Sequence, residues 1–203
     1  MKITLIDYGA GNVTSVERAL QRLGAASQRC SSPECIANAE ALLLPGVGHY
    51  AALIRALDER ALRAPLLDAI QRGVPFLGVC LGLQALYETS EEAPELAGLK
   101  LFPGSVRSLP TTVKLPHMGW NQLRPTRPSR LLEGLPAGAY FYFAHSFAAT
   151  AGDGEAVALS NHGTDFAAVI EKQNIYAVQF HPEKSGDAGS RLLQNFLAVC
   201  AGS

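Results

Sequence analysis

The sequence predicts an α/β fold, in which a mostly parallel open sheet carries helices on both faces and antiparallel additions. Short apolar runs have the length of buried strands at 3–7, 40–46, 74–79 and 175–180. Apolar residues recur at helical spacing within 13–23, 50–72 and 186–200. Strands that alternate with helices favour parallel pairing, because a parallel connection needs a long crossover.

The N-terminal half supplies three of these strands. Strand 3–7 opens into the turn signal YGAGN, and the first helical stretch follows it. Strand 40–46 ends at a Pro-Gly pair, and we expect Pro65 to break the helical stretch 50–72 into two pieces. After strand 74–79 we expect a helix that begins beyond Cys80 and ends near the acidic segment TSEEAPEL.

The chain changes character between about Leu99 and Gln173. Short β runs with turns between them stand at FPGSVRSLP, YFYFAHSF, EAVALSNHG and FAAVIEKQ. We expect these runs to add antiparallel strands to the same sheet. Strand 175–180 then returns to the buried pattern, and helix 186–200 closes the chain.

Length and composition indicate one domain over residues 1–203. A chain of this size with 48% hydrophobic residues can enclose a core, and its net charge of −1 gives no sign of nucleic-acid binding. No apolar stretch reaches the roughly 18 residues of a membrane span, and no signal peptide is evident. We therefore expect a cytoplasmic protein that binds neither nucleic acid nor membrane.

The four cysteines give no sign of a metal site. Cys30, Cys35, Cys80 and Cys200 form neither a C-x-x-C pair nor a zinc-ligand pattern. Because intracellular disulfides are rare, we expect all four to be free thiols, with no metal and no cofactor.

Cys80 stands at the point where a buried strand turns into a helix, between Gly78 and Gly82. G-x-C-x-G at this position is the cysteine form of the nucleophile elbow. The two glycines leave room for a tight turn, and the N-terminus of a following helix favours a thiolate. The alternative is a small cysteine that fills the core.

His181 and Glu183 lie at the end of another buried strand, in the segment AVQFHPEKS. Open α/β sheets place their sites at these carboxyl ends. The spacing lets the carboxylate reach one imidazole nitrogen while the other faces Cys80, which is the pattern of nucleophile, general acid–base and orienting anion. A histidine at a strand end can also simply bond to a loop.

The segment PGVG, residues 45–48, follows a buried strand and offers flexible backbone N–H groups. Such groups are the natural donors of an oxyanion hole that faces the nucleophile. Taken alone, however, the segment indicates only a turn.

Together these motifs resemble the class I, triad-type glutamine amidotransferases, which implies a flavodoxin-like α/β fold. The resemblance runs nearly end to end and is most specific for the glutaminase subunits of imidazole glycerol phosphate synthase. It rests on GVCLGLQ, PGVG and HPEKS, and on YGAGNVTSVERAL, LFPGSVRSLP, KLPHMGWN, YFYFAHSF and NIYAVQFHPEKS.

The resemblance implies roles for individual residues. Cys80 would attack the carboxamide of L-glutamine, and His181, oriented by Glu183, would transfer the protons. Backbone N–H groups near Val47, Gly48 and Leu81 would hold the oxyanion. Substrate contacts would come from Gln84, His145, Ser146 and Phe147. Ordinary strand polarity is the alternative for His145 and Ser146.

The resemblance also implies a partner that consumes the ammonia, a (β/α)8-barrel cyclase subunit in a heterodimer. That subunit would use ammonia on a phosphorylated nucleotide in L-histidine biosynthesis. Candidate contacts to it are Tyr8, Asn12, His117, Met118, Trp120 and Tyr142. Trp120 could instead be a core or sheet-packing residue.

Three other functions stay open at this point. The chain could serve another synthase, such as the one that makes pyridoxal phosphate, or it could be a cysteine hydrolase related to peptidases. It could also be an amidotransferase-like regulator without catalysis, although Cys80, His181 and Glu183 are all present.

Overall fold

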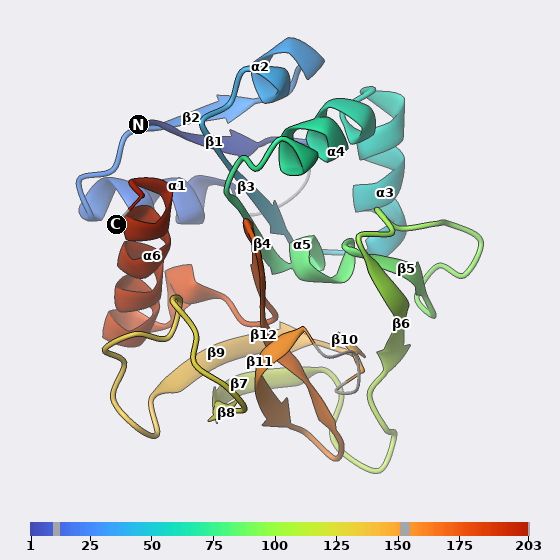
Figure 1. Ribbon diagram of the computed structural model, residues 1–203. Coiled ribbons are helices and arrows are strands. Elements are labelled where there is room, and N and C mark those ends of the chain that lie inside the picture. Colours follow the sequence, from blue (N-terminus) through green and yellow to red (C-terminus); the bar gives the residue numbers. More distant parts are fainter. Residues whose placement is uncertain (10–12, 151–154, 203) are drawn as a thin grey trace.

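The computed structural model describes residues 1–9, 13–150 and 155–202, and its centre is an eight-stranded sheet (Figure 1). The five strands at one side pair in parallel, and three antiparallel strands extend the other side. In spatial order the strands are β2 (Ser27–Cys30), β1 (Ile3–Ile6), β3 (Ala41–Gly46), β4 (Phe76–Cys80), β13 (Ile175–Val178), β12 (Asp165–Lys172), β11 (Ala156–Asn161) and β8 (Arg124–Pro125). The mixed, mostly parallel sheet confirms the predicted fold class.

Helices cover both faces of this sheet, as predicted. On one face lie α1 (Val13–Arg22) and α6 (Gly186–Cys200), and on the other lie α2 (Pro33–Ala37), α3 (Tyr50–Glu59) and α4 (Arg63–Gln71) (Figure 1). Successive residues of β3 alternate between the two cores: Ala41 and Leu43 pack with α1 and α6, whereas Leu42 and Leu44 pack with the other helices. Burial on both sides explains why this strand is continuously apolar.

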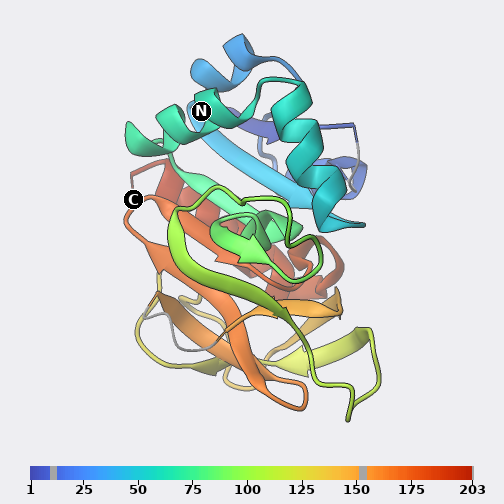
Figure 2. The ribbon, with the colours of Figure 1, turned by 90° about the vertical axis from the view of Figure 1, so that its right-hand side faces the viewer.

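Two smaller sheets lie outside the main one. The first contains β10 (Phe147–Ala149), β6 (Phe102–Ser108) and β5 (Tyr87–Ser90), and the second pairs β7 (His117–Gln122) with β9 (Tyr140–His145). Figure 2 looks onto the side of the molecule where the green β5 and β6 lie below α3 and α4.

The prediction that all the middle runs join one sheet is therefore wrong for 102–110 and 140–147, and right for β11 and β12. The burial patterns give the reason. β11 and β12 are buried along most of their length, as suits strands covered on both faces, whereas β9 buries only alternate residues and β7 buries only His117. One-sided burial suits a ribbon that packs over the main sheet.

The segment 50–72 forms two helices, but the break precedes Pro65. Residues 60–62 separate α3 from α4, and Ala61 has a positive φ of 55°. Pro65 lies in the first turn of α4, where the missing N–H leaves no hydrogen bond unmade.

The helix expected after Cys80 is much shorter than predicted. Helix α5 spans only Leu81–Gln84, and β5 begins at Tyr87. The carbonyl of Leu86 accepts hydrogen bonds from the N–H groups of Leu101 and Phe102 instead of continuing a helix. β2 and α2, which lie between residues 27 and 37, were not predicted from the sequence either.

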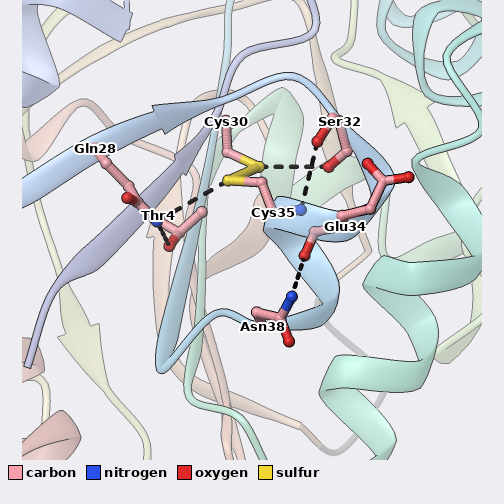
Figure 3. Close-up of a disulfide and its surroundings, with 7 residues drawn as sticks. All are labelled: Thr4, Gln28, Cys30, Ser32, Glu34, Cys35 and Asn38. Atoms are coloured by element: carbon pink, nitrogen blue, oxygen red, sulfur yellow. Dashed lines mark hydrogen bonds between the residues drawn. A yellow bond between two sulfur atoms is a disulfide. The ribbon is translucent and has the colours of Figure 1, made fainter.

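Cys30 and Cys35 form a disulfide, so the prediction of four free thiols is wrong for these two residues (Figure 3). Cys30 ends β2, and Cys35 lies in α2, whose N-cap Ser32 accepts a hydrogen bond from the Cys35 N–H. This tight turn brings the two Cα atoms to 5.9 Å, within the usual disulfide range. Cys80 and Cys200 are free. Across the described ranges, every helix is too short or too polar to span a bilayer.

The turn that follows β4 packs tightly against β3. A Cβ placed on Gly82 would meet the carbonyl oxygen of Leu44 at 2.1 Å, a distance that no real Cβ adopts, so the backbone would have to move. Gly24 offers a contrast, since a Cβ there would meet nothing within 4 Å.

We expect Gly82→Ala to lower the free energy of unfolding by roughly 2–3 kcal/mol, because overpacking against backbone forces a shift of the turn. Gly24 has a positive φ of 72°, but a Cβ there would lie in open space. Gly24→Ala should therefore lower the free energy of unfolding by only about 1 kcal/mol. Urea denaturation of both variants checks the difference. An equal or smaller loss for Gly82→Ala would contradict the packing argument.

Candidate active site

Cys80 ends β4 in a conformation that side chains rarely adopt. Its φ is 55° and its ψ is −106°, and its side chain is 3% exposed. Gly78 and Gly82 permit this turn because a Cβ on either would collide with backbone atoms. The strained strand-to-helix turn agrees with the predicted elbow. The helix that follows has only four residues, so its dipole gives the sulfur much less support than a full helix would.

His181 lies three residues beyond β13, beside Cys80 in the neighbouring strand. The backbone holds it from both sides, since its N–H donates to the carbonyl of Tyr142 and its carbonyl accepts from the Ser185 hydroxyl at 2.6 Å. Its Nδ1 lies 3.0 Å from Oε1 of Glu183, whose side chain is only 1% exposed. Glu183 sits in the 3₁₀ turn η1 (Pro182–Lys184), which returns its carboxylate to the ring.

The environment of His181 favours its cationic form. Burial alone would lower the pKa of this imidazole, but hydrogen bonds and charge interactions with Cys80 and Glu183 outweigh burial and raise it to about 10. At neutral pH His181 is therefore an imidazolium, oriented by Glu183 on one side and directed at Cys80 on the other.

A cavity of about 350 Å³ opens in front of Cys80. It brings together every residue predicted for catalysis, oxyanion binding or substrate binding except Glu183, which lies behind His181. These residues are Val47, Gly48, Cys80, Leu81, Gln84, His145, Ser146, Phe147 and His181. Val47 and Gly48 follow β3 directly, and Gly48 has a φ of 96°.

Glu92, Gln179 and Lys184, which also lines the cavity, are polar residues of this site that were not predicted from the sequence. Glu92 lines the cavity and accepts a hydrogen bond from the Tyr50 N–H at 2.9 Å. It belongs to the acidic segment that we interpreted only as the end of a helix. Gln179 is fully buried, and its Nε2 donates to the Cys80 sulfur at 3.6 Å. The sequence feature that could have identified Gln179 is a glutamine within an otherwise apolar run, AVQF.

The residues predicted to contact a partner fall into three groups. Met118 and Trp120 on β7 are 65% and 56% exposed, so the core alternative for Trp120 is wrong. Trp120 pairs with Tyr142 on β9, and their rings meet edge to face at 6.0 Å. Tyr8 and His117 are buried, and Asn12 lies outside the described residues.

Comparisons with known proteins agree with this geometry. The family model "Glutamine amidotransferase class-I" matches residues 4–200. A relative from Moorella thermoacetica, named imidazole glycerol phosphate synthase subunit HisH, is 46% identical over 96% of this chain and 93% of its own length. A relative of the same name from Methanothermobacter thermautotrophicus is 46% identical over 97% of this chain and 98% of its own length.

Solved structures show the same fold at low sequence identity. A crystal structure of a glutamine amidotransferase superposes with a TM-score of 0.77 at 20% identity, covering 98% of each chain. A glutamine amidotransferase from Thermotoga maritima gives a TM-score of 0.66 at 14% identity, covering 100% of this chain and 99% of the other. With nearly full-length matches in both sequence and fold, the chain belongs to the class I glutamine amidotransferases and, within them, to the imidazole glycerol phosphate synthase subunits HisH.

Proposed function

We propose that residues 1–203 act as one glutaminase domain, which hydrolyses L-glutamine through a thioester on Cys80 and passes the ammonia to a cyclase subunit in histidine biosynthesis. The observation that carries this proposal is the cavity in which a strained cysteine faces an imidazole–carboxylate pair. Such a trio performs acyl transfer in many unrelated folds.

The proposed reaction begins with attack of the Cys80 sulfur on the carboxamide carbon of glutamine. The oxygen of the tetrahedral intermediate would accept hydrogen bonds from backbone N–H groups of Leu81 and of the segment at Val47 and Gly48. The His181 imidazolium would then protonate the departing nitrogen, so that ammonia leaves and the thioester remains. The neutral imidazole would finally deprotonate a water that attacks the thioester and releases glutamate.

Two features suit the cavity to an amino-acid substrate. Oε1 of Gln84 is buried and has no hydrogen-bond partner among the described residues, which is costly unless a ligand donor reaches it. Glu92 places a carboxylate at the cavity wall, where the ammonium group of glutamine would pair with it.

The partner that we propose is a (β/α)8-barrel cyclase subunit in the cytoplasm, which would use ammonia to form imidazole glycerol phosphate and the aminoimidazole carboxamide ribotide. Free ammonia is largely protonated at neutral pH, so the site gains from a partner that covers it. Met118 both lines the cavity and belongs to the exposed part of β7, which supports docking at this strand. The HisH names of the relatives favour this partner over the pyridoxal phosphate synthase.

We expect Cys80→Ala to abolish glutamine-dependent synthesis by the complex and to leave ammonia-dependent synthesis intact, because only the ammonia source is lost. Product formation measured with glutamine and then with an ammonium salt checks this. Glutamine-dependent turnover at the wild-type rate would refute the role of Cys80.

We expect the pKa of His181 to fall well below its value of about 10 in Cys80→Ala, because the variant removes a hydrogen bond and a charge that stabilise the imidazolium. An NMR titration of the imidazole signals measures the midpoint, and His181→Gln assigns the signal. An unchanged midpoint would mean that Glu183 alone sets the pKa.

We expect Trp120→Ala to weaken complex formation by roughly 2 kcal/mol, about thirtyfold in Kd, since exposed tryptophans often anchor interfaces. Titration calorimetry with the cyclase measures the affinity, and a thermal melt tests folding. Glu59→Ala, at the exposed end of α3, serves as the control. Unchanged affinity in a folded Trp120→Ala variant would exclude this residue from the interface.

A further inference from the structure

Two buried histidines lie side by side between the exposed strand β7 and the cavity. His117 of β7 and His145 of β9 are opposite each other in the strand register and are 5% and 6% exposed. Nδ1 of His117 lies 3.0 Å from Nε2 of His145. His145 lines the cavity, whereas His117 does not.

The outer end of this pair fixes which nitrogens carry protons. Oδ1 of Asn121 accepts from the Gln122 N–H at 2.8 Å, and its Nδ2 donates to the Asn161 carbonyl at 2.9 Å, so the amide has one orientation. Nδ2 also lies 3.3 Å from Nε2 of His117. Because Nδ2 can only donate, Nε2 of His117 carries no proton, and Nδ1 carries the proton that is donated to His145.

The inner end gives the same assignment independently. Nδ1 of His145 lies 2.9 Å from the carbonyl oxygen of Phe147, which can only accept. His145 therefore carries its proton on Nδ1 and accepts from His117 through Nε2. Both rings are neutral, and the donors all point in one direction, from Asn121 to the carbonyl of Phe147.

The surroundings keep these rings neutral. His117 stacks on Phe143 at 4.8 Å and on His162 at 4.1 Å between ring centroids, and Phe166 meets the edges of His117 and His145. Burial lowers the pKa of His145 to about 3, and burial together with His162 lowers the pKa of His117 to about 4. A proton added to Nε2 of His117 would face the Nδ2 donor of Asn121, and a proton added to Nε2 of His145 would face the Nδ1–H of His117.

The chain of hydrogen bonds continues to the nucleophile. The Phe147 carbonyl also accepts from Nε2 of Gln84 at 2.7 Å, and the same Nε2 donates to Oε1 of Gln179 at 3.1 Å. Nε2 of Gln179 then donates to the Cys80 sulfur. With both protons of its amide engaged, Gln84 has a single orientation, which turns its unpartnered Oε1 away from these contacts.

We propose that His117 is a positioning residue for the glutaminase reaction: its Nδ1–H pairs with Nε2 of His145 and holds that ring against the Phe147 carbonyl, which also receives the Gln84 amide that faces the substrate. His117 reaches neither glutamine nor Cys80 and acts only through this chain. Since it belongs to β7, the chain also connects the proposed docking strand with the glutamine pocket. The inference rests on the function proposed above.

Three variants test the role in the complex with the cyclase. His117→Phe keeps a planar ring but removes the Nδ1–H donor, and leaves Nε2 of His145 unpaired. His117→Asn places an amide N–H near the position of Nδ1. His162→Phe is the matched control, because the His162 ring stacks on His117 but, among the described residues, forms its hydrogen bond with the Lys114 carbonyl, outside the chain.

For His117→Phe we expect kcat/KM for glutamine to fall about tenfold, through the cost of an unpaired buried acceptor, while ammonia-dependent synthesis stays unchanged. His117→Asn should recover most of the loss, and His162→Phe should stay within about twofold of wild type. Unchanged kcat/KM in a folded His117→Phe variant, or equal losses for Phe and Asn at position 117, would overturn the proposal.

A second measurement does not depend on the variants folding. ¹⁵N NMR of the wild-type protein should show His117 and His145 as neutral rings protonated on Nδ1, and a proton on Nε2 of either ring would overturn the chain. Failure here is distinguishable from failure of the proposed function. If Cys80→Ala retains glutamine-dependent synthesis, the function is wrong, whereas if only the His117 results disagree, the positioning role alone is wrong.

Discussion

The parallel pairing of β4 with β3 on one side and β13 on the other is the constraint on which the site depends. The register places Gly46 opposite Cys80, and Val178 opposite Val79, so all three strands end at nearly the same level. Parallel strands release their following loops at one edge of the sheet, where open α/β folds form their sites. The oxyanion segment at Val47, the nucleophile Cys80 and the base His181 therefore meet, although they are far apart in the chain.

Close packing then converts this common edge into a defined geometry. The φ of 55° at Cys80 persists only because the surroundings leave no alternative: a Cβ on Gly46 would meet that of Leu81 at 2.4 Å, and one on Gly82 would meet the Leu44 carbonyl. Glycine at these positions lets α5 press against β3. The sulfur thus points into the cavity through backbone packing, with little help from the dipole of so short a helix.

The sequence predicted the parts of the molecule whose signals are local. Continuous apolar runs marked the buried strands, and the glycines around Cys80 together with the spacing of His181 and Glu183 marked the site. Much of the rest depends on non-local pairing. The separation of β7 and β9 from the main sheet and the short α5 are set by partners that no local pattern encodes. The disulfide of Cys30 with Cys35 is local, but the turn between β2 and α2 that forms it was not predicted. Glu92 and Gln179 were missed because only the fold brings them to Cys80.

The histidines of this protein show how the environment decides what one side chain does. His181 has a buried carboxylate and a thiol as neighbours, and it is held as a cation that can give a proton to a leaving group. His117 and His145 are buried among aromatic rings, and burial lowers the pKa of both although the Phe147 carbonyl acts in the opposite direction on His145. The cavity is thus lined by one histidine that can exchange protons and by another, His145, whose hydrogen bonds have a fixed direction.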